Sequence, residues 1–380
     1  MKSSKRNYEC LVILNTKILM NLGRFIRRLG QTIGAFLTKK NTFSKPKVLI
    51  EAGAQGWNSV FFVEFRESLK DYLSNAEIST SSINKNKVYV WQAVNSLKKE
   101  KPSHFCFDPR TSSQKPMQAL VDTTILLFCL GLWNITPIVI LTDGSIRLWR
   151  YQAFLLTGSS GVVVTFLDAP SMGGLFPHSR VIGPSYMPIS LKRLEWIDEQ
   201  NLVTKQSELD FNEIFFLGSL YPKRSTTLEN LQSELIARGS NVAIVIEEKS
   251  INTSIEDYWG KINSHFSLIT TTQQQPSPSY QMDRVHIDQM VFRISEALAS
   301  RKLLFCPKVL GMSRYFLEDV HFVGFESIAD AADKIDYMFE HPNLAREIAF
   351  RGGERFREVT QGRVFWDEID RLLDSKLLRT

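Results

Sequence analysis

The sequence predicts an α/β protein made of two doubly wound domains that face a cleft, and three observations lead to that prediction. The chain has 380 residues, which is more than one hydrophobic core ordinarily serves. Short apolar runs alternate with helical segments, a pattern typical of parallel sheets with helices on both faces. A polar stretch at residues 198–210, interpreted as a linker, interrupts the alternation, which then begins again and predicts a second domain.

In the first half, five apolar runs predict strands and the segments between them predict helices. The strands are expected at residues 47–52, 87–91, 104–107, 137–141 and 161–166, and the helices at 58–73, from 91 onward, at 114–132 and near 147–157. The apolar stretch Thr123–Leu141 is broken by Asn134, Thr136 and Pro137. It therefore predicts a buried helix, a turn and a strand rather than a membrane span.

The second half repeats the alternation. Strands are expected at residues 213–217, 242–247, 266–270, 302–306 and 321–325, and helices at 226–238, 255–263, 296–300, 328–340, 343–357 and 364–377. Gly239 is placed as the glycine that ends the first of these helices. The two domains are then expected at 47–205 and 206–362, after a basic amphipathic segment at 1–46 and before a C-terminal helix at 363–380.

Charge and cysteine content exclude several classes of function. The net charge is +6, but residues 1–47 hold eleven Lys and Arg against one acid, so that the rest of the chain, with 35 bases and 39 acids, carries −4. A mildly acidic body lacks the basic surface that wraps nucleic acid. The four cysteines form no C-x-x-C pair and have no histidine at ligand spacing. We therefore expect no metal site and no disulfide framework, and a cytoplasmic location.

The basic N-terminal segment predicts an amphipathic helix. Apolar residues recur every three or four positions over residues 17–40, and Arg24, Arg27 and Arg28 fall largely on the other side. Such a helix suits the inner face of an anionic membrane. A helix packed on the body, or a loose leader, explains the pattern equally well, and Gly23, Gly30 and Gly34 weaken the helix. We expect no signal peptide, because Asn15, Thr16 and Lys17 cut the preceding apolar stretch.

The segment Gln289–Ser300 contains the main candidate binding residues. It predicts a loop that leads into a helix, with Arg293 and Glu296 at the junction. The amides of a helix N-terminus and a guanidinium both favour phosphate, whereas a carboxylate accepts hydrogen bonds from sugar hydroxyls. The pair therefore suits a nucleoside diphosphate. An acid that stabilises the helix dipole, beside an exposed arginine, is the alternative.

This segment and two others resemble a known family. One set of residues matches, in order and spacing, the C-terminal domain of group 1 glycosyltransferases, and it is closest to their spore-maturation-protein-like (CgeB-like) branch. The set consists of Arg293, Glu296, Ala297–Ala299, His341-Pro342, Ile348-Ala349 and Gly352. The stretch FLGSLYPKR at Phe216–Arg224 resembles the first strand, glycine turn and helix entry of that domain. The resemblance covers about residues 211–370, and the N-terminal half matches more loosely, at Asp108-Pro109-Arg110 and Asp143-Gly144.

The resemblance implies the GT-B fold, in which two Rossmann-like domains face a cleft, a nucleotide sugar serves as co-substrate and no metal or other cofactor is required. It also implies that the last helix returns to the N-terminal domain, for which Trp366, Ile369 and Leu372 provide an apolar face. The implied donor-binding residues are Glu296 at the ribose, Arg293 at the diphosphate, Gly218 at a close approach and Arg224 at the phosphates, with Asp288 compared to a glutamate of related retaining enzymes. Lys223 is a further donor-site candidate, because without a metal the charge of the leaving group must be stabilised by cations and helix amides. Phe292 and Arg301 stand where the family has glycine.

Three residues are candidates for the base that an inverting transferase needs at its acceptor hydroxyl. Asp143 and Asp168 each follow a predicted strand, and His178 lies in a proline-rich loop. A turn-forming aspartate or a surface histidine explains each of them as well.

The sequence thus predicts a cytoplasmic glycosyltransferase that moves a sugar from a nucleotide sugar to a lipid-linked or cell-surface glycan at a membrane. Two alternatives stay open. One is a catalytically inactive nucleotide-sugar-binding module of the same fold, which Phe292 and Asp288 favour. The other is a membrane-docked scaffold whose active part is the N-terminal helix.

Overall fold

The first of two parallel sheets fills the N-terminal half of the computed structural model. The structure describes residues 18, 21–36, 48–52, 59–72, 78–82, 89–107, 116–141, 162–165, 181–183, 185–203, 209, 211–220, 222–248, 253–271, 290–309, 311–361 and 363–373. The strands are β1 (Val48–Ala52), β2 (Ile78–Ser82), β3 (His104–Phe107), β4 (Thr136–Leu141), β5 (Val162–Thr165) and β6 (Val181–Ile182). They pair in parallel in the order β2-β1-β3-β4-β5-β6.

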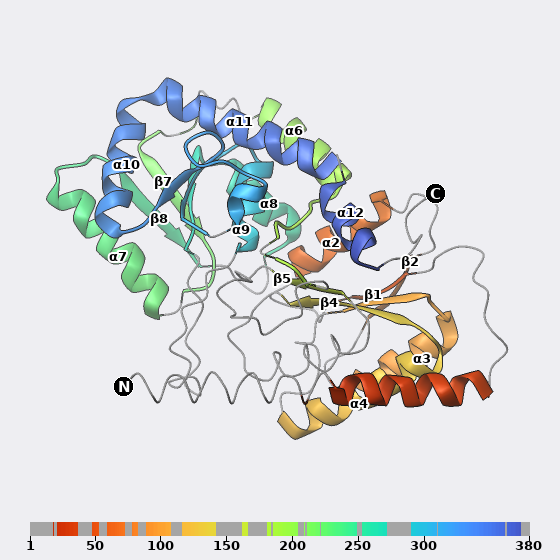
Figure 1. The fold of residues 1–380 in the computed structure, drawn as a ribbon. Coiled ribbons are helices and arrows are strands. Elements are labelled where there is room, and N and C mark those ends of the chain that lie inside the picture. The colour runs from red at the N-terminus through yellow and green to blue at the C-terminus, as the bar shows by residue number, and fades with distance from the viewer. Residues whose placement is uncertain are drawn as a thin grey trace, which may run out of the picture.

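Helices cover both faces of this sheet. Helices α3 (Tyr89–Glu100) and α4 (Pro116–Leu132) lie on one face, and α2 (Ser59–Tyr72) and α12 (Val364–Leu373) lie on the other (Figure 1). The buried side chains Val90, Ala93, Val94 and Leu97 of α3 recur at helical spacing.

The second sheet has the same topology. Its strands are β7 (Glu213–Leu217), β8 (Ala243–Glu247), β9 (Ser267–Ile269), β10 (Leu303–Pro307) and β11 (Val323–Phe325), parallel in the order β11-β10-β9-β7-β8. Its helices are α7 (Pro222–Ala237), α8 (Ile255–Asn263), α9 (Phe292–Ala299), α10 (Ile328–Glu340) and α11 (Pro342–Gln361), with a short 3-10 turn at Met312–Arg314. In both sheets the strand order reverses beside the first strand, so the predicted doubly wound α/β class is confirmed.

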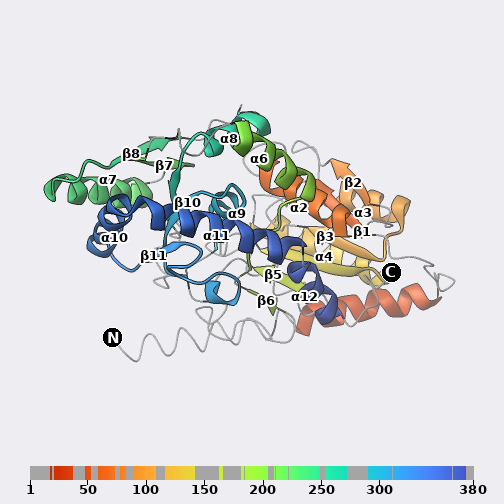
Figure 2. The same cartoon turned by 90° about the horizontal axis from the view of Figure 1, so that it is seen from above.

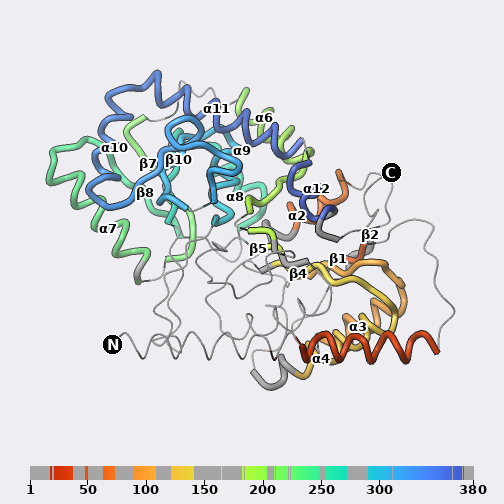
Figure 3. Tube along the Cα trace, viewed as in Figure 1, coloured from red at the N-terminus to blue at the C-terminus, as the bar shows by residue number. Residues whose placement is uncertain are grey.

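Two crossings join the halves (Figures 2 and 3). Helix α6 (Leu191–Val203) runs from the first sheet to the second, and α11 leads back into α12. On α12, Trp366 Nε1 donates to Ser68 Oγ at 3.1 Å, and Asp367 accepts from Tyr72 Oη at 2.6 Å. Helix α12 thus packs on α2, while the boundaries of the predicted domains remain a prediction.

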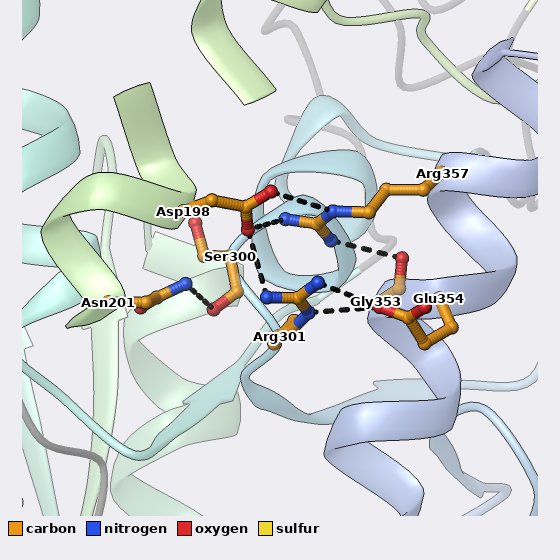
Figure 4. Close-up of polar contacts among 7 residues, drawn as sticks. All are labelled: Asp198, Asn201, Ser300, Arg301, Gly353, Glu354 and Arg357. Atoms are coloured by element: carbon orange, nitrogen blue, oxygen red, sulfur yellow. Dashed lines mark hydrogen bonds and ion pairs between the residues drawn. The ribbon is translucent and has the colours of Figure 1, made fainter. Parts of the chain in front are cut away.

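An ion-pair cluster ties both crossings to the turn after α9 (Figure 4). Asp198 on α6 accepts from Arg301 Nη1 at 2.9 Å and from Arg357 Nε at 3.3 Å, and Arg301 also donates to Glu354 at 2.8 Å. Arg301 has a φ of +53°, a conformation that costs a non-glycine residue about 1 kcal/mol. A Cβ at Gly353 would overlap its side chain. Arg301 therefore has the left-handed backbone conformation that the expected glycine would adopt, while its side chain binds Asp198 on α6 and Glu354 on α11.

Three sequence-based predictions are wrong. Residues 89–91 begin helix α3 rather than ending a strand, and the strand is β2, whose sequence ISTSS lacks an apolar run. Residues 198–203 belong to α6 rather than to a linker, because Leu194 and Ile197 are buried beneath a polar outer face. Helix α9 begins at Phe292 rather than near 296. The helix predicted near 147–157 lies outside the described residues.

The N-terminal segment is helical at Ile18 and over residues 21–36 and packs on α4. Gly23, Arg27, Gly30 and Gly34 are its buried positions. A methyl group at Gly30 would lie 2.5 Å from the carbonyl oxygen of Phe128, and Arg27 Nη2 donates to the carbonyl of Ile135 at 3.1 Å. The glycines that weaken the helix in isolation therefore let two backbones approach closely.

Other expectations about the N-terminal half have mixed outcomes. No helix in the described part of the chain combines the length and apolar composition that crossing a bilayer requires. The segment Thr123–Leu141 is a helix, a turn and a strand, as predicted. The apolar runs around Cys129 and Cys306 predict two buried thiols; Cys306 is buried, whereas Cys129 is only half-buried.

The packing of the N-terminal helix predicts a pH dependence through His104. Burial and the nearby Arg27 lower the pKa of His104 from 6.5 to about 4. The unfolded chain therefore binds a proton between pH 6.5 and 4 that the folded protein does not, and stability falls as the pH falls through this window. We expect His104 to account for a loss of about 3 kcal/mol. Urea unfolding from pH 7 to 4 measures it, with His104→Gln removing this component and exposed His341→Gln as the control. A profile unchanged in His104→Gln would contradict the assignment.

Candidate functional site

The candidate site lies at the carboxyl ends of β7 and β9. These strands are neighbours, and the strand order reverses between them. In doubly wound sheets a ligand binds at such a switch point, beyond the carboxyl ends of the strands. Gly218 follows β7, and Thr270 and Thr271 follow β9, so this edge is where the fold itself predicts a ligand.

Arg224 joins the two strand ends. It lies in the first turn of α7, where Pro222 occupies the first helical position. Its Nε donates to Thr271 Oγ1 at 2.9 Å, and its Nη1 donates to the carbonyl of Ser219 at 2.8 Å. Its guanidinium carbon lies 5.5 Å from the centre of the Phe216 ring. One cation is thereby fixed beside the end of β7.

Arg293 brings a second cation to the same ring. It lies in the first turn of α9, and its guanidinium carbon lies 5.7 Å from the centre of the Phe216 ring. A Cβ at Gly218 would lie 3.3 Å from its Nη2, so the guanidinium packs against this glycine. Its side chain is 13% exposed, and its buried Nη1 has no hydrogen-bond partner among the residues that the structure describes. Burial opposes the charge, but Tyr258 and Glu296 raise the pKa of Arg293, which stays cationic.

Glu296 is the anion of the site and is held from two sides. Its Oε2 accepts from Arg293 Nε at 2.9 Å, and its Oε1 accepts from Tyr258 Oη at 2.6 Å. Glu296 is 1% exposed and Tyr258 is 3% exposed. Burial raises the pKa of Tyr258 well above its usual value, so the phenol stays a donor. Each carboxylate oxygen keeps a lone pair beyond these two hydrogen bonds.

Helix α9 also contacts the first half of the chain. The backbone amide of Met187 donates to Ser295 Oγ at 3.0 Å, and both groups are buried. Met187 lies between β6 and α6, on the segment that crosses to the second sheet. The helix that carries Arg293 and Glu296 therefore lies at the junction of the two sheets.

The structure brings together four of the residues assigned to the donor, Gly218, Arg224, Arg293 and Glu296. Their individual roles stay predictions. The alternative of an exposed arginine is wrong, because Arg293 is largely buried and paired with Glu296. Sequence reasoning missed Tyr258 and Thr271. Tyr258 had only the apolar spacing of α8 as a signal, which predicts burial and not a carboxylate partner.

The remaining candidates are not described. Asp143, Asp168, His178 and Asp288 lie outside the described residues, and Lys223 lies in α7 without a described side chain. Within the described ranges, no group of three or more His, Cys, Asp or Glu side chains is placed to hold a metal ion. The predictions for these residues therefore stay predictions.

Comparison with known proteins supports the same part of the chain. Residues 256–363 match the model of a family described as glycosyl transferase-like. The matched segment runs from α8 beyond α11 and includes Tyr258, Arg293 and Glu296. No curated protein sequence matches the chain significantly.

Solved structures resemble the whole fold. Anabaena HepE in complex with UDP-glucose has a TM-score of 0.54 at 12% identity, over 86% of this chain and 99% of HepE. HepE with UDP has a TM-score of 0.54 at 11% identity, over 86% of this chain and all of HepE. A glycosyltransferase from Rickettsia africae has a TM-score of 0.49 at 13% identity, over 88% of this chain and all of that one. The chain thus has the GT-B fold, in which HepE resembles it, and residues 256–363 are similar to the glycosyl transferase-like family.

Proposed function

We propose that the protein is a glycosyltransferase that takes a sugar from a nucleotide-sugar donor bound at the ends of β7 and β9. The observation that carries this proposal is the convergence of Arg224 and Arg293 on Phe216 beneath Gly218, at the switch point of the sheet. Two cations at this point suit a diphosphate. The glycosyl transferase-like match over residues 256–363 and the UDP-glucose bound to HepE support the same ligand class.

The arrangement fits the chemistry of glycosyl transfer. The sugar passes through an oxocarbenium-like transition state while the nucleoside diphosphate leaves with negative charge. Arg293 and Arg224, with the first amides of α9 and α7, stabilise that charge without a metal. The unpartnered Nη1 of Arg293 gains an acceptor when a phosphate binds. Glu296 accepts from the ribose hydroxyls, and Tyr258 and Arg293 fix its orientation.

The proposal also covers the acceptor base, the acceptor and the location. We assign the acceptor base to Asp143, Asp168 or His178, the acceptor to lipid-linked or surface glycans, and the location to the cytoplasmic face of a membrane. We also place the chain in the spore-maturation-protein-like branch, on the residues from Arg293 to Gly352 that match its pattern.

Nucleotide-sugar binding is tested by thermal unfolding in the presence of a panel of UDP- and GDP-sugars. A ligand bound only by the folded state raises Tm, so we expect one donor to raise Tm in the wild-type protein and in Glu340→Ala, a control on the exposed end of α10. Glu296→Ala should weaken donor binding by about 100-fold, which is the loss expected for a charge-assisted pair of hydrogen bonds. Wild-type affinity in Glu296→Ala would count against the assignment.

An inactive binding module of the same fold is the second candidate. Phe292, half-buried and packed on the core, stands where the family has glycine. Donor binding without transfer or hydrolysis, over a broad panel of glycan acceptors, would favour the module. Release of nucleoside diphosphate that depends on an acceptor would favour the enzyme.

A further inference from the structure

The N-terminal helix presents an apolar stripe on the side that does not contact the protein. Ile18, Leu22, Phe25, Leu29 and Phe36 are 56%, 43%, 64%, 45% and 85% exposed. At 3.6 residues per turn they lie within about 60° of one another around the helix axis. The residues buried on α4, Gly23, Arg27, Gly30 and Gly34, lie on the opposite side. We call these five exposed residues the apolar stripe.

The orientation of the helix is fixed by its contacts with the body. Gly30 lies against Phe128, and a Cβ on Gly131 of α4 would overlap the carbonyl oxygen of Arg27. Gln31 Nε2 adds a hydrogen bond to Asn134 Oδ1 at 3.4 Å. Rotating the helix to bury the stripe would place large side chains where only glycine fits. The stripe is therefore held outward.

Charge identifies what covers the stripe. Arg24 and Arg28 are exposed along one side of it, and residues 1–47 carry eleven basic residues against one acid. A second copy of this chain, docked stripe to stripe, would bring like charges together. Anionic lipid headgroups instead complement the arginines, and the acyl region accepts the apolar side chains.

We propose that the N-terminal helix docks the protein in the interface of an anionic bilayer, with the apolar stripe inserted and Arg24 and Arg28 at the headgroups. Sixteen residues, 21–36, span about 24 Å along the helix axis, and with Arg27 buried against the protein the helix lies in the membrane plane rather than crossing it. The bilayer then lies along the α3–α4 side of the first sheet, opposite α2 and α12 (Figure 1). This inference extends the proposed function, but its test does not depend on the function.

Vesicle flotation of the full-length protein tests this docking. We expect binding to vesicles of phosphatidylcholine with phosphatidylglycerol, and weak binding to phosphatidylcholine alone or at high salt. The double substitution Phe25→Ser with Leu29→Ser should lower the partition coefficient by about 100-fold, because two large apolar side chains leave the interface. Arg24→Gln with Arg28→Gln should lower it by about 30-fold on anionic vesicles only.

The matched control replaces two apolar residues elsewhere that are more exposed than Phe25 and Leu29. Leu202 on α6 and Ile236 on α7 are 82% and 66% exposed, and their change to serine should leave flotation at the wild-type level. All the substituted side chains are exposed, so thermal unfolding should stay close to wild type, as should any donor-induced rise in Tm. Wild-type protein that does not float with anionic vesicles, or a Phe25→Ser, Leu29→Ser variant that floats like wild type, would overturn the proposal. A lipid-free dimer that this variant abolishes would overturn it as well, because a second copy would then cover the stripe.

Discussion

Arg293→Met should abolish detectable donor binding and lower the free energy of unfolding by about 4 kcal/mol. Glu296 is 1% exposed and would lose the guanidinium that neutralises it, keeping only the hydrogen bond from Tyr258. Removing one partner of a buried ion pair leaves an uncompensated charge and typically costs about 3–5 kcal/mol. Urea unfolding measures the stability, and isothermal titration with UDP- and GDP-sugars measures the binding.

A double variant separates the structural role of this pair from its role in binding. In Arg293→Met with Glu296→Gln neither residue of the pair carries a charge, and Tyr258 can still donate to the amide oxygen. Most of the lost stability should therefore return, while donor binding should stay absent because the cation is missing. A double variant that binds the donor like the wild type would show that Arg293 and Glu296 only hold the fold.

Gly352→Ala should have the second largest effect, a loss of about 3 kcal/mol of stability. A Cβ at this position of α11 would overlap the carbonyl oxygen of His321 and lie 2.9 Å from Leu298 Cδ2 of α9. The backbone oxygen cannot swing aside as a side chain does, so α11 must move away from the turn at His321 that precedes β11, and overpacking of this kind costs about 1–3 kcal/mol or more. The thermal midpoint and urea midpoint report the loss.

Gly260→Ala is the matched control for this substitution. Gly260 lies inside helix α8, and, apart from its neighbours and the backbone of that helix, no atom of the described residues lies within 4 Å of a Cβ placed there. Alanine there should raise stability by up to about 1 kcal/mol, because it lowers the entropy of the unfolded chain at no steric cost. Similar effects of the two substitutions would show that close packing at Gly352 does not control the stability of α11.

The second sheet follows the sequence more closely than the first. The strand at 213–217 and the helices at 255–263 and 328–340 begin and end as predicted, because buried apolar runs and helical spacing coincide there. In the first sheet, β2 is an edge strand of sequence ISTSS, whose pairing with β1 needs no apolar run. The Val and Tyr residues at 88–90 then gave a false strand signal for what begins as α3.

The candidate site also has parts that the sequence predicts and parts that it does not. The arginine, the glutamate and the glycine turn of FLGSLYPKR are local patterns, and a resemblance finds them. Their partners come from distant segments. Tyr258 reaches Glu296 across 38 residues and Thr271 reaches Arg224 across 47, and such contacts depend on how the strands are ordered. Which face of the N-terminal helix packs on α4 also depends on tertiary packing, because in the sequence the glycine face and the apolar face can both serve as the contact face.

The return of α12 to α2 bears on the order in which the protein assembles during synthesis. Phe65 and Tyr72 of α2 contact Trp366, with ring centres 5.0 Å and 5.9 Å apart. The N-terminal half leaves the ribosome first, yet its core lacks Trp366 until about 290 further residues beyond Tyr72 have been translated. Vectorial folding from the N-terminus therefore cannot finish this half early. Until α12 arrives, the apolar surface of α2 is exposed and is a natural binding site for a chaperone.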